Sequence, residues 1–138
     1  MRAIIDTNVV LDYFLARKPN IVEADKLFEL IQEEKFEAFA TASCVTDIYY
    51  IVSKTLGETL ARDTIRKLLQ LFEIIAIDGQ DCNIALDLPM DDFEDALIVA
   101  CVDKEFIDCI ISNDKSFLNT NQQLAKVVDY KGFFDLIN

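Results

Sequence analysis

Two spacings of apolar residues alternate along the chain, and they predict strands separated by helices. Short apolar or alternating runs predict strands at residues 2–6, 36–41, 73–77, 108–112 and 125–129. Apolar residues three and four positions apart predict helices at residues 8–16, 23–33, 43–56, 58–72, 80–86, 92–104 and 131–137, with Ser43 as the N-cap of the third. This order predicts an α/β fold with a central, mainly parallel sheet of four to five strands and helices on both faces.

Composition limits the chain to one packed unit. Its 138 residues are 52% hydrophobic and include only 3 Gly and 2 Pro, so we expect a single domain spanning residues 1–138. No apolar run approaches the roughly 20 residues that a membrane span needs. Asp6 also interrupts the N-terminal apolar stretch that a signal peptide requires. We therefore expect a cytoplasmic protein that has no membrane partner.

Cysteine and histidine usage narrows the chemistry. The cysteines show no CxxC spacing and lie in apolar segments, which favours buried reduced thiols over a disulfide framework; they are Cys44, Cys82, Cys101 and Cys109. The absence of histidine excludes Ser-His-Asp and Cys-His catalysis and mixed Cys/His zinc sites. The net charge of −12 argues against an extended nucleic-acid-binding surface and favours cations or a basic partner.

Four aspartates fall at corners between predicted strands and helices. Asp6 and Asp114 follow the first and fourth strands, Asp47 lies in the helix after the second strand, and Asp95 begins the helix before the fourth. Ligands of open parallel sheets bind beyond the carboxyl ends of the strands, so these side chains can converge on one edge. Each also has a structural explanation: Asp6 and Asp92 can cap helices, Asp47 and Asp95 can favour a helix dipole, and Asp114 can serve in a turn. For Asp92, capping is the favoured explanation.

Their joint location favours a metal site. Carboxylates gathered in one cleft raise one another's pKa unless a positive charge lies between them. With oxygen ligands and no histidine, Mg²⁺ or Mn²⁺ is the natural cation. Such ions hold phosphates and activate water, which makes phosphodiester hydrolysis the favoured chemistry.

Residues 4–9, Ile-Ile-Asp-Thr-Asn-Val, form an apolar segment that contains Asp-Thr-Asn. This segment resembles the opening strand of PIN domains, which ends in the same three residues. Residues 92–100 resemble the central acidic helix of the family, and residues 110–117 resemble its late strand, where Thr-Arg-Asp or Thr-Arg-Asn is usual. The resemblance covers nearly the whole chain in order and spacing. It implies a three-layer α/β/α sandwich, dependence on Mg²⁺ or Mn²⁺, and endonucleolytic cleavage of RNA.

The resemblance also implies roles for single residues. Asp6 and Asp95 would ligate the metal directly, and Asp114 would complete the site directly or through water. Thr7 and Asn8 would orient Asp6 or its waters, and Ser112 would lie beside the phosphate. Two departures from the family pattern stand out: Asp47 replaces the usual Glu and is one methylene shorter, and Ser112-Asn113 replaces Thr-Arg, which removes a cation.

The function expected from the resemblance is the toxin of a toxin–antitoxin pair, a homodimer that cleaves RNA and is blocked by the basic tail of an antitoxin. A free-standing RNA-processing enzyme and a catalytically weak interaction module are the alternatives. A phosphoacceptor receiver domain is disfavoured because the first strand offers Asp6 alone. The core is the favoured location for Tyr49 and Tyr50. Solvated surface charge is favoured over RNA contact for the remaining cations considered, which are Arg17, Lys18, Lys54, Arg62, Arg66 and Lys115.

Overall fold

A computed structural model describes the whole chain, Met1–Asn138, and contains one five-stranded parallel sheet. The strand order is β3-β2-β1-β4-β5, and every neighbouring pair runs parallel. The strands are β1 Arg2–Ile5, β2 Glu37–Thr41, β3 Glu73–Ile75, β4 Cys109–Ile111 and β5 Val127–Val128. The predicted parallel sheet and the position of each strand along the chain are confirmed.

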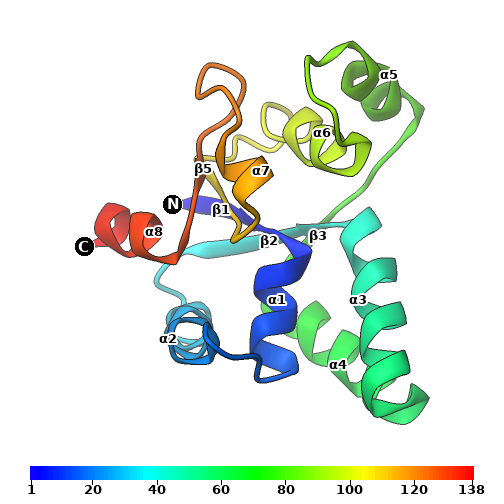
Figure 1. The fold of residues 1–138 in the computed structure, drawn as a ribbon, viewed down its shortest axis with the longest axis vertical. Coiled ribbons are helices and arrows are strands. Elements are labelled where there is room, and N and C mark those ends of the chain that lie inside the picture. The colour runs from blue at the N-terminus through cyan, green and yellow to red at the C-terminus, as the bar shows by residue number, and fades with distance from the viewer.

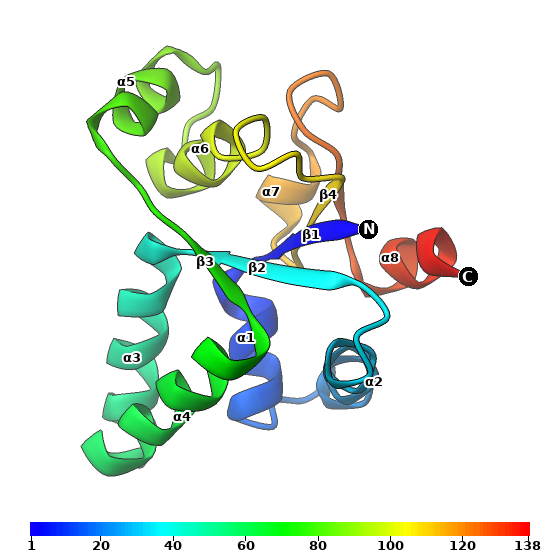
Figure 2. The same cartoon turned by 180° about the vertical axis from the view of Figure 1, so that it is seen from behind.

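Helices cover both faces of this sheet. Figures 1 and 2 show α1 to α4 on one face and α5 to α7 on the other, with α8 beside α2. Their bounds are α1 Thr7–Phe14, α2 Ile21–Gln32, α3 Ala42–Leu56, α4 Glu58–Leu71, α5 Gly79–Asp87, α6 Phe93–Ala100, α7 Lys115–Leu118 and α8 Tyr130–Ile137. The fold is thus the expected three-layer α/β/α sandwich. None of the helices has the length and hydropathy that crossing a bilayer requires.

The core lies between these layers. Thirty-two buried residues form one hydrophobic cluster, which includes all the side chains of β4 and most of those of β1 and β2. A second cluster of four residues, Ala85, Ala96, Leu97 and Ala100, joins α5 to α6. All five residues from Ala96 to Ala100 are buried, as the apolar sequence of α6 predicts. The predicted burial of the cysteines is correct for Cys44, Cys101 and Cys109 and wrong for Cys82, which is only half-buried.

The path of the chain creates a topological switch point beside β1. The chain passes from β1 to β2 and β3 on one side, and then crosses over β1 to β4 and β5 on the other. A crevice forms beyond the carboxyl ends of the two strands at such a point. Here the strands are β1 and β4, which pair with Ile5 opposite Ile111. The backbone N–H of Asp6 donates to the carbonyl of Ile111 over 2.9 Å, which brings the ends of the two strands together.

The predicted start of α3 is wrong. Ser43 is not the N-cap, because α3 begins at Ala42 with Thr41 in the cap position. The last residue of β2 is also Thr41, so strand and helix are joined without a loop. The Ser43 hydroxyl instead lies 2.9 Å from the hydroxyl of Thr41.

The region from α6 to α7 also differs from the prediction. The helix expected over residues 92–104 ends at Ala100, because the chain must turn to start β4 beside β1. In that turn Phe106 has a φ of +54°, and the N–H of Asp108 donates to the carbonyl of Arg2. The four-residue helix α7 was not predicted, because a single turn is too short to give a helical period.

Candidate active site

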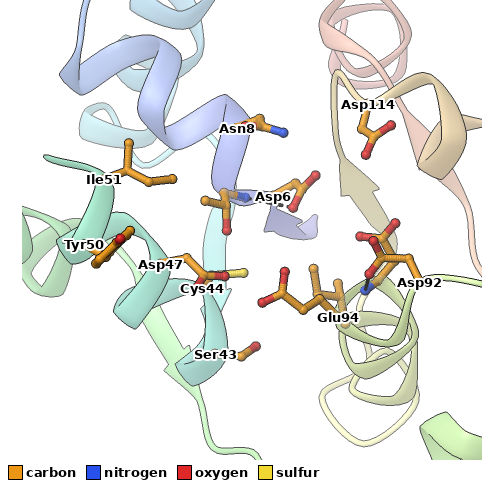
Figure 3. A pocket seen from close by; sticks show the side chains of 13 residues that line it. Asp6, Asn8, Ser43, Cys44, Asp47, Tyr50, Ile51, Asp92, Glu94 and Asp114 are labelled. Atoms are coloured by element: carbon orange, nitrogen blue, oxygen red, sulfur yellow. Dashed lines mark hydrogen bonds between the residues drawn. The ribbon is translucent and has the colours of Figure 1, made fainter. Parts of the chain in front are cut away.

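A cavity of about 290 Å³ opens at the carboxyl edge of the sheet, at the switch point. Its lining combines residues that follow β1, β2 and β4 with the start of α6 (Figure 3). The lining residues are Asp6, Thr7, Asn8, Ser43, Cys44, Asp47, Tyr50, Ile51, Asp92, Glu94, Asp95, Ile98 and Asp114. The structure therefore brings the four predicted acids together, along with Asp92 and Glu94. None of the 13 lining residues is Lys or Arg.

Asp6 is held at the centre of the cavity by its two neighbours in the fold. It is the N-cap of α1, and its Oδ1 accepts a hydrogen bond of 2.8 Å from the N–H of Thr7. Its Oδ2 accepts a second bond of 2.8 Å from the hydroxyl of Ser112. Asp6 is only 7% exposed, and this burial raises the pKa of its carboxyl. The two hydrogen bonds counteract part of that rise.

Ser112 links Asp6 to Asp114 across the switch point. The buried hydroxyl that donates to Asp6 accepts from the N–H of Asp114 over 3.1 Å. Asp114 in turn caps α7, because its Oδ1 accepts from the N–H of Ser116 over 2.9 Å. Figure 3 shows the Asp114 side chain pointing into the same space as Asp6. Ser112 does not line the cavity itself, so its contribution is to fix the two carboxylates that do.

The start of α6 supplies the opposite wall. Asp92 is the N-cap, as favoured from the sequence, and its Oδ1 accepts from the N–H of Asp95 over 3.1 Å. Asp95 lies in the first turn of the helix. Burial, followed by the charges of Asp92 and Asp6, raises the pKa of Asp95 to about 7. Without a bound cation, the Asp95 carboxyl would thus be only partly ionised at neutral pH.

Glu94 belongs to the cavity, and the sequence did not identify it. It reaches from α6 toward α3, the helix that carries Asp47 (Figure 3). Hydrogen bonding to the Asp47 carboxyl, together with burial and the Asp47 charge, raises the pKa of Glu94 to about 6. Its position in the first turn of α6 is also explained by a favourable interaction with the helix dipole. The direction of its side chain across the cavity could not be read from spacing.

The short Asp47 therefore faces a longer acid. The resemblance gives the usual acid on this helix as Glu, one methylene longer than Asp47. Glu94 approaches from the opposite wall of the cavity. A cation bound between two such carboxylates would offset their mutual repulsion.

Asn113, which stands where the family pattern has Arg, turns away from the cavity. Its side-chain amide donates to Oδ2 of Asp12, a residue on α1 that is 3% exposed. The hydroxyl of Tyr130 donates to the same oxygen over 2.8 Å, and Arg17 Nη2 lies 2.9 Å from Oδ1. These four residues form a polar cluster, hereafter the Asp12 cluster. It occupies Arg17 with an internal ion pair.

Two further candidate cations are also paired. Arg62 pairs with Glu58, and Arg66 pairs with Asp63, both on the surface of α4. These pairs agree with the expectation that the cations are surface charges.

The donor set fits a hard divalent cation by its chemistry. Every ionisable side chain of the cavity apart from Cys44 and Tyr50 is a carboxylate, and hard cations such as Mg²⁺ and Mn²⁺ prefer oxygen ligands. Burial raises the pKa of the Cys44 thiol, which disfavours a thiolate ligand. As the side chains lie, no group of three or more forms a ready-made metal cage. The carboxylates would have to adjust to enclose an ion.

The fold and the cavity together define a doubly wound α/β protein with an acid-lined crevice at its switch point. Residues 2–116 match the PIN domain family over most of the chain, and the chain belongs to that family. Ribonuclease VapC1 from Aquifex aeolicus is 25% identical over 134 residues, which cover 94% of this chain and 92% of the relative.

Solved structures share the fold. A toxin–antitoxin complex from Klebsiella pneumoniae contains a chain that matches with a TM-score of 0.68 at 21% identity, over 93% of this chain and 97% of the other. VapC20 from Mycobacterium tuberculosis, described as a sarcin-ricin loop cleaving toxin, matches with a TM-score of 0.67 at 14% identity, over 83% of this chain and 92% of the other. At these identities the likeness is one of fold.

Proposed function

We propose that this protein is a divalent-metal-dependent endoribonuclease that hydrolyses RNA phosphodiester bonds. The observation that carries the proposal is the cavity at the switch point, into which six carboxylates project and no Lys or Arg. A phosphate cannot enter such a cavity unless a cation neutralises the surrounding charge. Membership of the PIN domain family and similarity to a ribonuclease support the same activity.

The proposed cation is Mg²⁺ or Mn²⁺, with Asp6, Asp95 and Asp114 as its ligands. When bound, it would neutralise phosphate charge and activate water for attack at phosphorus. Asp6 is the most constrained of the three, because Thr7 and Ser112 fix both of its oxygens.

The other polar residues of the cavity have proposed supporting roles. Thr7 and Asn8 line the cavity beside Asp6 and would orient that carboxylate and its waters. Asp92 holds the backbone of Asp95 at the start of α6. Asp47 and Glu94 form the far side, where they could orient or deprotonate the attacking water.

The proposed biological role is that of the toxin in a toxin–antitoxin pair acting in the cytoplasm, with a basic antitoxin as partner. The net charge of −12 and the cation-free cavity favour a partner that inserts arginine among the carboxylates. The similarity to a chain of a toxin–antitoxin complex supports this role. A homodimer is part of the same proposal.

A catalytically weak interaction module is the second candidate, and two observations favour it. The carboxylates do not form a ready-made cage, and Asp47 is shorter than the Glu of the family pattern. A free-standing RNA-processing enzyme would share the chemistry of the toxin and differ only in lacking an antitoxin.

The test is to incubate the purified protein with a structured RNA, with and without Mn²⁺, beside an Asp6→Asn variant. We expect internal cleavage that requires Mn²⁺ and is lost in the variant. Absence of cleavage, or equal cleavage by the variant, would contradict the nuclease function. Binding of a basic peptide without cleavage would instead support the interaction module.

A further inference from the structure

Tyr50 is an exposed aromatic ring in a cavity otherwise rich in acids. The core was the favoured location for this residue, and that prediction is wrong, because Tyr50 is 57% exposed. The helix α3 buries Cys44, Ile48 and Val52, whereas Tyr50 projects from a different face and lines the cavity. Its neighbour Tyr49 is half-buried and packs against the core. The Tyr50 ring is therefore not part of the core, and its exposed surface is available to a ligand in the cavity.

A stripe of four residues runs along this face of α3. Ser43, Asp47, Tyr50 and Lys54 are spaced by four, three and four positions, which places them on one side of a helix. Lys54 Nζ lies 4.7 Å from the centre of the Tyr50 ring. The helical rise puts Lys54 about 10 Å beyond Asp47 along the axis. The stripe therefore leads from the carboxylates to an aromatic ring and then to a cation.

We propose that Tyr50 and Lys54 form a nucleotide subsite, in which the Tyr50 ring stacks on an RNA base next to the cleaved bond and Lys54 contacts the adjoining phosphate. This inference rests on the proposed ribonuclease function. Ile51, which also lines the cavity, extends the apolar wall beside the ring. A flat base with polar edges fits a wall of this kind, because aromatic stacking holds single-stranded nucleic acid with little dependence on sequence.

The charge of the molecule favours stacking as the source of affinity. Most nucleic-acid binding relies on the neutralisation of phosphates, but this chain carries a net charge of −12, and its cavity has no cationic lining. Because few cations are available, the energy of RNA binding has to come from the metal and from contacts with bases. Tyr50 is the aromatic residue that lines the cavity, and Lys54 sits beside it.

A second cavity adjoins the first on the side of α6. This cavity, of about 470 Å³, shares Asp92 and Asp95 with the first. Its lining includes the uncharged polar residues Asn119, Thr120 and Asn121. The carboxylates thus lie between α3 and the segment after α7. This arrangement is expected if an RNA strand crosses the proposed metal site with nucleotides on both sides.

The stacking is tested directly by fluorescence, because the chain has no tryptophan. A Tyr50→Trp substitution in the Asp6→Asn background gives one tryptophan reporter in a protein for which we expect no cleavage. Phe106→Trp in the same background is the matched control, since Phe106 is 80% exposed and lies before β4, at the opposite edge of the sheet. The ligands are a random 12-nucleotide single-stranded RNA and an abasic ribose–phosphate of equal length. An arginine-rich peptide is the protein-like probe.

We expect RNA to quench the tryptophan of the Tyr50→Trp variant, whereas the abasic oligomer leaves it unchanged and RNA leaves the control unchanged. Equal quenching by both oligomers would overturn base stacking. Base stacking would also be overturned if the anisotropy of labelled RNA showed binding while the tryptophan fluorescence stayed unchanged. Quenching by the peptide and not by RNA would overturn the nucleotide assignment in favour of a protein partner.

Steady-state cleavage with an intact Asp6 provides the second readout. Tyr50→Ala should raise KM about tenfold or more with kcat nearly unchanged, and Tyr50→Phe, which keeps the ring, should retain the wild-type KM. Lys54→Gln should reduce the slope of log K against log salt by about 0.7, the contribution of one phosphate on a single strand. Melting temperatures equal to wild type would exclude a folding defect.

The outcomes separate this subsite from the nuclease function. Cleavage by wild type with an unchanged KM in Tyr50→Ala would overturn the subsite and leave the nuclease intact. Base-dependent quenching together with no cleavage by any form of the protein would overturn the nuclease function and leave the subsite intact.

Discussion

Ser112 helps to fix the geometry of the cavity, although its side chain does not line it. Its buried hydroxyl donates to Asp6 and accepts from the backbone of Asp114, so one side chain connects two proposed metal ligands. The hydrogen bond to Asp6 also favours the ionised carboxylate against the effect of burial. Asp6 and Asp114 each combine two roles. They cap helices that begin at the crevice, and they are also proposed metal ligands.

Replacing Ser112 by Ala should impair the site more than the fold. The change removes the donor to Asp6, so the pKa of that carboxyl should rise further and Mn²⁺ should bind about tenfold more weakly. The loss of one charge-assisted hydrogen bond should lower the free energy of unfolding by about 1–3 kcal/mol. Calorimetric titration with Mn²⁺ and chemical denaturation measure the two effects. Ser112→Thr keeps the hydroxyl and is the control; affinity that is equal in all three proteins would contradict the role of Ser112.

The metal-free protein should become less stable as pH rises, because Asp95 loses its proton. Its pKa is raised to about 7, above the usual 3.8 of an aspartate, so the folded state binds the proton more tightly than the unfolded chain. The resulting stabilisation is present below about pH 4 and is lost as pH rises through about 7. Without divalent ions, the melting temperature should therefore include a contribution that declines over this range.

The Asp95→Asn variant isolates that contribution. It should reduce the decline and raise the free energy of unfolding at pH 7.5 by about 1 kcal/mol, since the removed charge is only partly buried. Added Mn²⁺ should raise the melting temperature of wild type more than that of the variant. A metal-free stability that is identical in the two proteins at every pH would show that Asp95 is not crowded by its neighbours.

At the scale of elements, α6 carries both a structural and a chemical function in its first turn. The Asp92 side chain caps the helix through the N–H of Asp95, and its charge also raises the pKa of that residue. The sequence favoured Asp92 as a cap, and the structure confirms it. The sequence did not predict that the Asp92 carboxylate also lines both cavities.

Two substitutions at Asp92 separate the cap from the charge. Asp92→Ala should lower the free energy of unfolding by about 1 kcal/mol, the usual effect of losing an N-cap side chain. Asp92→Ser should keep most of the stability because Ser is also a good N-cap, yet both variants should lower the pKa of Asp95 by removing a nearby charge. Urea denaturation and NMR titration of the Asp95 carboxyl measure the two effects. Equal loss of stability in both variants would contradict the capping role.

The elements themselves were largely predictable, and their ends were not. The spacing of apolar residues located all five strands and seven of the helices. It does so because burying one face of a helix or strand determines where its apolar residues recur. The start of α3 and the end of α6 were wrong, because both depend on where the chain must join or leave the sheet. The single turn of α7 left no period to detect.

At the scale of the whole molecule, the crossover beside β1 assembles the site from segments distant in sequence. The acids at the ends of β1 and β4 converge because these strands are neighbours at the switch point. Their convergence was therefore predictable from topology. Tyr50 could have been placed beside Asp47 as well, because the two residues are three positions apart on one helix. The contribution of Glu94 and the turning away of Asn113 depend on side-chain direction, which neither composition nor spacing contains.

The Asp12 cluster should be a main determinant of global stability. It joins α1, the corner after β4 and α8 through a buried carboxylate. Asp12→Ala leaves Arg17, Asn113 and Tyr130 without their partner, so we expect a loss of about 3 kcal/mol or more in the free energy of unfolding. Tyr130→Phe removes one donor and should lose about 1 kcal/mol. Denaturation curves compare them; a smaller effect for Asp12→Ala than for Tyr130→Phe would contradict the central position of the carboxylate.

The most direct test of the account is the rate of RNA cleavage as a function of Mn²⁺ concentration. Wild type is compared with Asp6→Asn and Asp95→Asn, and Phe106→Ala serves as an exposed control far from the cavity. We expect a saturable increase with Mn²⁺ for wild type and the control, and a rate at least about 100-fold lower for both aspartate variants, as expected when a preorganised charge is removed from an active site. A rate that does not depend on Mn²⁺, or that survives both substitutions, would contradict a metal-dependent ribonuclease centred on Asp6 and Asp95.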